Sequence, residues 1–169
     1  MNALQEKYGK DIQDILAKYP DAEKRAAVMP LLYVAQREDG YITLQDMKDI
    51  AEIVGVTPTH VASIVGFYTL YHDKQEGKYR LQVCNDLPCA LRGADEYLED
   101  LCDNLGIKVG GSTEDGLVTV EGVMCLAACD KAPMFQVQDG KGISYHEEQT
   151  VESTMKLIEG WRKQEGKKK

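Results

Sequence analysis

The stretch Tyr79-Arg80-Leu81-Gln82-Val83-Cys84-Asn85-Asp86-Leu87-Pro88-Cys89 joins an alternating apolar and polar pattern to two cysteines at its end. The alternation over residues 79–84 predicts a β-strand. A second strand is predicted over residues 117–123, and a second cysteine pair, Cys125 and Cys129, follows it. A rigid strand end can aim thiolates, while the loop that follows leaves backbone N–H groups free to point at sulfur. These four cysteines are therefore candidate ligands of a metal centre.

The spacing of the four cysteines narrows the kind of centre. Four residues separate the first pair, three separate the second, and 35 lie between the pairs. Four cysteine thiolates are the usual ligands of a [2Fe-2S] cluster, and the N-terminus of the helix after Cys89 would stabilise its reduced, more anionic form. Structural zinc tolerates these spacings and stays an alternative, as do packed thiols without metal. A Rieske centre is excluded, because no histidine lies near either pair.

Composition limits the function classes. The chain has five cysteines, an odd number, and no apolar N-terminal segment typical of secretion, so a disulfide framework is disfavoured. Cys102 is predicted to be a small buried residue of a helix. No window reaches the roughly 18 apolar residues of a membrane span, so we expect a soluble, unexported chain without membrane insertion. The net charge is −8, with basic residues gathered only at 162–169, which disfavours nucleic acid as a partner.

Helical patterns fill the first part of the chain. One helix is predicted to begin near Tyr19-Pro20-Asp21 and to stop at Asp39-Gly40, with a kink or break at Pro30. A second begins at a capping box of Thr43 and Asp46 and ends at Gly55, and a third opens at Thr57-Pro58. The apolar and aromatic residues of the third helix and its end are expected in the core: Val61, Ile64, Val65, Tyr68 and the run Phe67–Tyr71.

The pattern changes to α/β after a polar stretch. Helical spacing is found over 90–105 and 151–161, and short strands are predicted at 135–137 and 143–145 around a hairpin-like connection. The sequence therefore predicts an α+β protein with four parts: an N-terminal helical bundle (1–72), a linker (73–78), an α/β domain (79–161) and a basic flexible tail (162–169).

Four segments together carry a resemblance to a known family. They are Val83–Ala94, which contains the first cysteine pair, Cys125–Met134, which contains the second, and the shorter runs Asp39–Ile42 and Val65–Thr69. They resemble the thioredoxin-like [2Fe-2S] ferredoxin family, which includes the small peripheral-arm subunit of NADH:quinone oxidoreductase, respiratory complex I. The resemblance runs from about residue 18 to residue 161.

The resemblance implies a fold and a role. The fold would be a bundle of three or four helices followed by a thioredoxin-like domain, with one [2Fe-2S] cluster on Cys84, Cys89, Cys125 and Cys129. The chain would be a non-catalytic electron-transfer subunit that exchanges single electrons with the FMN of a partner flavoprotein subunit, which also binds NADH. It would be cytoplasmic and attached to the inner membrane through the larger complex. The sequence contains neither a G-x-G-x-x-G nor a G-x-x-x-x-G-K-[ST] nucleotide motif, in agreement with the expectation that a partner subunit binds NADH and FMN.

Alternatives stay open at this point. Similar subunits serve NAD-linked hydrogenases and formate dehydrogenases, the chain could be a zinc-stabilised interaction module, and the isolated chain could form a homodimer. A thiol-disulfide enzyme is disfavoured because no Cys-x-x-Cys follows the first strand.

Two residues depart from the family pattern. Alanine at 127, where glycine is common, indicates a backbone compatible with a Cβ, so a left-handed conformation is not expected there. Asp86 stands where an uncharged polar residue is common, and its charge would lower the reduction potential of a nearby cluster.

Overall fold

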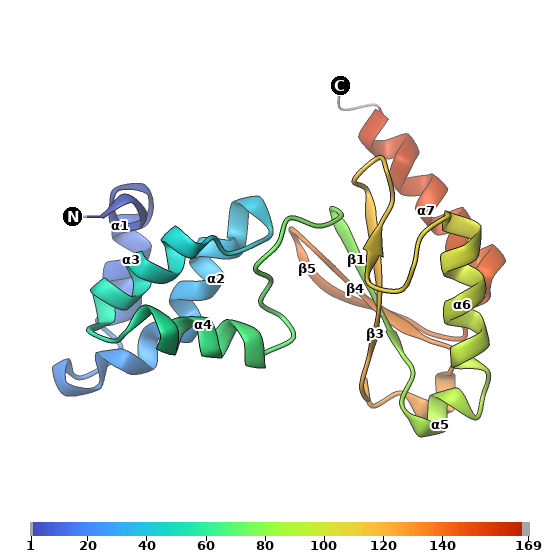
Figure 1. Cartoon of the computed structure of the whole chain (residues 1–169), viewed down its shortest axis with the longest axis horizontal. Helices are drawn as coiled ribbons and strands as arrows, with labels where there is room; N and C mark the ends of the chain where they lie inside the picture. Colours follow the sequence, from blue (N-terminus) through green and yellow to red (C-terminus); the bar gives the residue numbers. More distant parts are fainter. Residues whose placement is uncertain (1, 167–169) are drawn as a thin grey trace. The chain divides into compact units, whose positions relative to one another are not determined.

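The chain folds into two compact units in a computed structural model that describes residues 2–166 (Figure 1). The first unit ends at Gln75 and the second starts at Glu76. Helices alone form the first unit, and helices with a five-stranded sheet form the second, which confirms the predicted α+β class. The elements of the first unit are α1 (Ala3–Leu16), the 3₁₀ helix η1 (Asp21–Ala27), α2 (Val28–Asp39), α3 (Leu44–Val54) and α4 (Pro58–Phe67).

Local capping signals set the ends of these helices. The Thr43 hydroxyl accepts a bond from the backbone N–H of Asp46 at 3.1 Å, and the Asp46 carboxylate accepts one from the Thr43 N–H at 2.8 Å. This is the predicted capping box, and α3 ends as predicted at Gly55 in a left-handed conformation. The predicted kink or break near Pro30 is found as a break just before it, since the 3₁₀ helix η1 ends at Ala27 and α2 begins at Val28. Pro30 is the third residue of α2, in the first turn, where the missing N–H costs no helical hydrogen bond.

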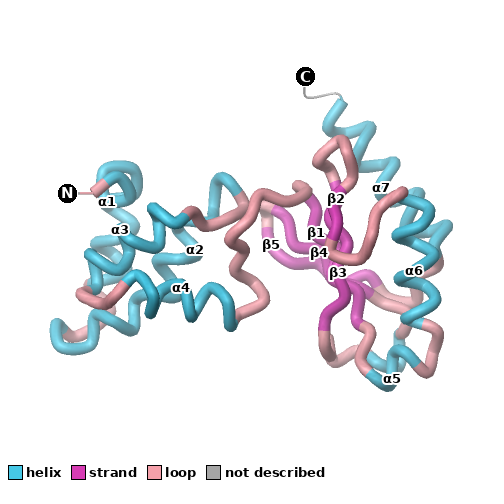
Figure 2. Tube along the Cα trace, in the orientation of Figure 1, coloured by secondary structure: helices cyan, strands magenta, loops and turns pink. Residues whose placement is uncertain are grey.

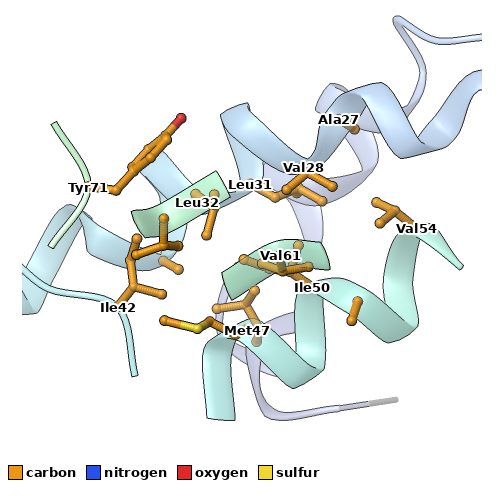
Figure 3. Packing of buried hydrophobic residues seen from close by; sticks show 14 of the residues in the cluster. Ala27, Val28, Leu31, Leu32, Ile42, Met47, Ile50, Val54, Val61 and Tyr71 are labelled. Carbon is orange, nitrogen blue, oxygen red and sulfur yellow. The ribbon is translucent and has the colours of Figure 1, made fainter. Parts of the chain in front are cut away.

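The first unit packs its helices around one apolar core (Figure 3). The residues at its centre are fully buried: Ala27, Leu31, Leu32, Ile42, Ile50 and Val61. Val61 and Val65 are buried as predicted, but Phe67 is 77% exposed and Tyr68 42% exposed, so the expectation that both lie in the core is wrong. Phe67 is two residues past Val65 and therefore points to the opposite side of α4, and the backbone leaves helical geometry at Tyr68.

Within residues 2–166, no single helix has the length and apolar character to cross a membrane. The helices Leu44–Val54 and Pro58–Phe67 meet that criterion only when they are taken together, and a bend of 118° separates them.

The second unit is built on a mixed sheet with the strand order β2-β3-β1-β4-β5 (Figure 2). Strand β1 lies at its centre, parallel to β3 and antiparallel to β4. The two edge strands, β2 and β5, pair antiparallel with β3 and β4. The strands are β1 (Tyr79–Cys84), β2 (Gly111–Ser112), β3 (Val118–Val123), β4 (Phe135–Asp139) and β5 (Gly142–His146).

Helices α6 (Ala94–Leu105) and α7 (Val151–Gly166) cover one face of this sheet (Figure 1). Leu81 and Val83 of β1 pack with Leu101 of α6 and Ile158 of α7 in a core that is separate from that of the first unit. Because side chains alternate along a strand, the polar residues of β1 and β3 point to the other face. Gly77, just before β1, lies so close to β3 that a Cβ would come within 2.5 Å of the Val118 backbone.

Two predicted boundaries in this unit are wrong. The helix expected over 90–105 is divided into α5 (Leu87–Ala90) and α6, because Gly93 adopts a left-handed conformation with φ +88°. The tail expected to be flexible over 162–169 is helical as far as Gly166, and residues 167–169 lie outside the described residues. Trp161 stacks on Tyr79 with ring centroids 4.3 Å apart, and the Arg162 Nε donates to Asp115 at 2.9 Å, so contacts with the sheet unit hold the last turns of α7.

Candidate functional site

The sheet brings the two cysteine pairs to one edge. Strands β1 and β3 are parallel neighbours, and Cys84 at the end of β1 stands in register with Val123 at the end of β3. One further bond, from the Asn85 N–H to the Val123 carbonyl at 3.1 Å, continues the pairing past Cys84. Cys125 follows Val123, the last residue of β3, by two residues. The candidate ligands thus emerge at the carboxyl ends of two adjacent strands.

Three of the thiols lie together at this edge. Cys84 and Cys89 are each 1% exposed and share a small core with Ala94, Ala132 and Met134, against which the half-buried Cys129 packs. Burial first, and then the neighbouring Cys84 and Cys129 thiols, raise the pKa of Cys89 to about 12. Ionisation of a buried thiol beside two other thiols costs free energy when no cation is present. A bound metal ion stabilises the thiolate and so favours loss of the proton.

Cys89 belongs to the short helix α5. Most backbone N–H groups of this helix already donate to other acceptors, so few are free to donate to a cysteine sulfur. The Leu87 N–H donates to the Asp86 carboxylate at 3.0 Å, and the N–H groups of Cys89 and Ala90 both donate to the Asp86 carbonyl. The helix predicted to begin directly after Cys89 begins four residues later than expected, and stabilisation of a reduced cluster by its N-terminus stays a prediction. Cys89 is inside α5, and α6 begins only at Ala94.

Cys125 is different, because its side chain is exposed and accepts a hydrogen bond from the chain itself. The Ala127 N–H donates to the Cys125 Sγ at 3.3 Å. Ala127 has φ +59°, in the left-handed region, so the sequence-based expectation for this residue is wrong. The tight turn between Cys125 and Cys129 imposes the conformation usually reserved for glycine, and alanine adopts it at a cost of roughly 1–2 kcal/mol.

The fifth cysteine is not part of this arrangement. Cys102 is 3% exposed in α6 and packs in the core between the helices and the sheet. Burial, and secondly the neighbouring Asp103, raise the pKa of its thiol. It is the small buried residue that the sequence predicted.

Three large apolar side chains that stand close to the cysteines in the chain are exposed. Leu87 is 69% exposed, Leu91 80% and Met124 75%. Leu91 belongs to the apolar pattern of the helix predicted over 90–105, but it lies between α5 and α6 and is exposed, and no pattern in the sequence marks Leu87 or Met124. Their closeness to the cysteines in the chain was the available signal, because large apolar residues beside a polar loop have no helix or strand partner to cover them.

The four cysteines suit a [2Fe-2S] cluster by the chemistry of their donor set. Four thiols stand at one sheet edge, and an amide N–H already points at one sulfur, as is common around cluster thiolates. Within residues 2–166, no three side chains of Cys, His, Asp or Glu form a group that could hold a single metal ion. The ligand set of Cys84, Cys89, Cys125 and Cys129 therefore stays a prediction.

A thioredoxin-like sheet unit that follows a helical unit and carries four cysteines at one sheet edge defines a recognisable class of metalloprotein. The sequence pattern of the thioredoxin-like [2Fe-2S] ferredoxin family matches residues 12–162. The chain belongs to this family.

Several characterised relatives are similar over most of the chain. Subunit 2 of the NADH-quinone oxidoreductase of Thermus thermophilus is 45% identical over 128 residues, which are 76% of this chain and 71% of the relative. The mitochondrial NADH dehydrogenase [ubiquinone] flavoprotein 2 of Dictyostelium discoideum is 38% identical over 88% of this chain. A subunit of the Mycobacterium tuberculosis NADH-quinone oxidoreductase is 35% identical over 90% of it. The chain spans 59% and 58% of the lengths of the last two relatives.

Solved structures support the fold. A chain of the NAD+-reducing [NiFe]-hydrogenase in its H2-reduced state superposes with a TM-score of 0.68 and 18% sequence identity, covering 81% of this chain and 23% of the other. At this identity the likeness concerns the fold alone. The recognised family and the thioredoxin-like fold predicted from the sequence are thereby confirmed.

Proposed function

We propose that this chain is an electron-transfer subunit of an NADH:quinone oxidoreductase, and that Cys84, Cys89, Cys125 and Cys129 hold one [2Fe-2S] cluster. The observation that carries the proposal is the placement of both cysteine pairs at the carboxyl ends of the parallel strands β1 and β3. Family membership and the names of the relatives support it.

The residues of the site have distinct tasks in this function. Such a cluster, when bound, supplies one-electron chemistry. Cys84 and Cys89 would hold it on the buried side, Cys129 at the half-buried start of the 3₁₀ helix η2 (Cys129–Lys131), and Cys125 on the exposed side. The Ala127 N–H would stabilise negative charge on the Cys125 sulfur. The chain offers no nucleotide motif, so NADH and FMN would belong to a partner flavoprotein subunit.

The exposed side of the site fits such a partner. Leu87, Leu91 and Met124, which are close to the cysteines in the chain and are here called the apolar rim, are exposed, and Cys125 is the exposed cysteine of the five. Apolar residues at the centre of a contact and polar ones outside it are the usual anatomy of a protein interface. We therefore place the flavoprotein contact at this rim, with the subunit peripheral to the membrane and cytoplasmic.

Anaerobic purification tests the cluster. The expected product contains two iron and two sulfide ions per chain and shows an electron paramagnetic resonance (EPR) signal on reduction; zinc without iron would overturn the proposal. Replacing Cys84 or Cys129 by serine should abolish or destabilise the cluster. The matched control is Cys102→Ser, which removes the cysteine outside the site and should leave the visible spectrum unchanged.

The assembly is tested by co-purification. A tagged chain in its native host should retain an NADH-oxidising flavoprotein, and Leu91→Lys should weaken that retention while the cluster spectrum stays intact. Recovery of hydrogenase or formate dehydrogenase subunits would reassign the complex and keep the electron-transfer role. Sedimentation of the isolated chain, with and without Leu91→Lys, decides whether it forms a homodimer.

A further inference from the structure

A row of hydrogen-bonded polar side chains crosses the sheet face that α6 and α7 leave uncovered. Gln82 of β1 stands in register with Glu121 of β3 on one side and with Gln136 of β4 on the other. The Gln82 Nε2 donates to the Glu121 Oε1 at 2.7 Å, and the Gln136 Nε2 donates to the Gln82 Oε1. Gln82 is 1% exposed and Gln136 8% exposed, so the amides of the row have little access to water.

This row is the one next to the cysteine edge. Cys84 follows Gln82 by two residues and therefore points to the same face of the sheet, in register with Val123. Two residues along a strand span about 7 Å and neighbouring strands lie about 4.8 Å apart, so the Cα atoms of Glu121 and Cys84 are roughly 8 Å apart. Glu121 is the acidic residue of this row.

The surroundings of Glu121 favour its neutral form. Burial raises the pKa of its carboxyl, the bond from Gln82 and the charge of Arg80 lower that pKa, and the charge of Glu76 raises it. The Arg80 guanidinium is itself committed to Glu76 through a bond of 2.7 Å. Apart from Arg80, strand β1 presents the uncharged Gln82 beside Glu121, and β2, the other neighbour of β3, is Gly111–Ser112.

We propose that Glu121 is the proton-binding site coupled to reduction of a cluster at the cysteine edge, an inference that rests on the proposed function. When a one-electron donor such as a reduced flavin adds an electron at that edge, one proton from solvent adds to the Glu121 Oε2. One O–H bond of a hydronium ion breaks, one forms on the carboxylate, and water is released, so the added negative charge is neutralised within the same sheet. Gln82 keeps its bond to Oε1 in both states and holds the carboxyl in place.

The size of the coupling follows from the separation. A unit charge about 10 Å from the carboxyl, at an effective dielectric constant of about 20, changes its proton affinity roughly tenfold. A tenfold change corresponds to about 59 mV for a one-electron couple. The midpoint potential should therefore fall by about this amount from an acidic to an alkaline plateau.

Potentiometric titration of the purified cluster-loaded chain between pH 5 and 9, followed by EPR and with dithionite as reductant, tests this. Glu121→Gln, which is permanently neutral, should hold the potential at the acidic plateau at every pH. Glu121→Asp should keep a pH-dependent potential, and Glu99→Gln, an exposed α6 residue, should behave as the unmodified chain does.

Infrared difference spectra between oxidised and reduced states provide a second readout. Reduction should produce a carboxylic acid C=O band that Glu121→Gln lacks. A pH-independent potential in the unmodified chain, or a slope retained in Glu121→Gln, would overturn the inference while the cluster remains. A chain that binds no iron at all would overturn the proposed function, and this inference with it.

Discussion

Replacing Ala127 by glycine should stabilise the second unit. Ala127 has φ +59°, where an L-residue pays roughly 1–2 kcal/mol, and glycine removes that strain. Glycine also gives the unfolded chain more freedom, which costs about 0.5–1 kcal/mol. The net expectation is a gain of about 0.5–1 kcal/mol. For a unit of this size such a gain corresponds to an increase in melting temperature of roughly 2–8 °C.

The neighbouring alanine provides the matched control. Ala128 has φ −131°, which any residue adopts, so Ala128→Gly removes no strain and should destabilise by about 0.5–1 kcal/mol through the unfolded state alone. The two variants have the same composition and alter the same loop, yet they should shift stability in opposite directions.

Urea unfolding of the metal-free chain, followed by tryptophan fluorescence, is the assay. Trp161 is the single tryptophan, and it stacks on Tyr79 in the second unit, so its emission reports on this unit. If Ala127→Gly lowers the unfolding free energy as much as Ala128→Gly does, the left-handed assignment of residue 127 is wrong.

Three further results are expected. Asp86→Asn removes a negative charge beside the cysteines and should raise the midpoint potential by on the order of tens of mV in a redox titration; an unchanged value would count against a role for this charge. Glu121→Gln should raise the melting temperature at pH 7, because burial raises the folded-state pKa of the Glu121 carboxyl above its unfolded value of 4.5. Such a shift destabilises the folded chain only at a pH where Glu121 is ionised in the unfolded chain, so the substitution should bring no gain below about pH 4. Leu101→Ala should cost about 2–5 kcal/mol in urea unfolding, since Leu101 is fully buried, whereas Leu91→Ala, at a residue 80% exposed, should stay within about 0.5 kcal/mol; equal losses would contradict the packing described.

Strands and capping signals could be predicted from the sequence because they depend on nearby residues. The alternation over residues 79–84 gave β1 with its bounds, and the capping box of Thr43 and Asp46 gave the start of α3. The same type of signal, Asn2 with Gln5, marks the start of α1, which the hydrophobic pattern does not predict because this helix has only two buried apolar residues.

Other features depend on contacts that no local pattern reveals. The left-handed Ala127 is imposed by closure of the loop between two cysteines, against the preference of the residue itself. The exposure of Phe67 depends on where α4 ends. The row of Gln82, Glu121 and Gln136 requires the strand order, because its members come from three strands that are distant in sequence.

The two separate apolar cores have a consequence for how such proteins can diverge. All four candidate ligands, the polar row and the apolar rim belong to residues after Glu76, and the core of that unit contains none of the helices α1–α4. Each core can therefore accommodate substitutions by repacking within its own unit. A sheet unit that has its own core and its own cysteines is a part that can be paired with different leading segments.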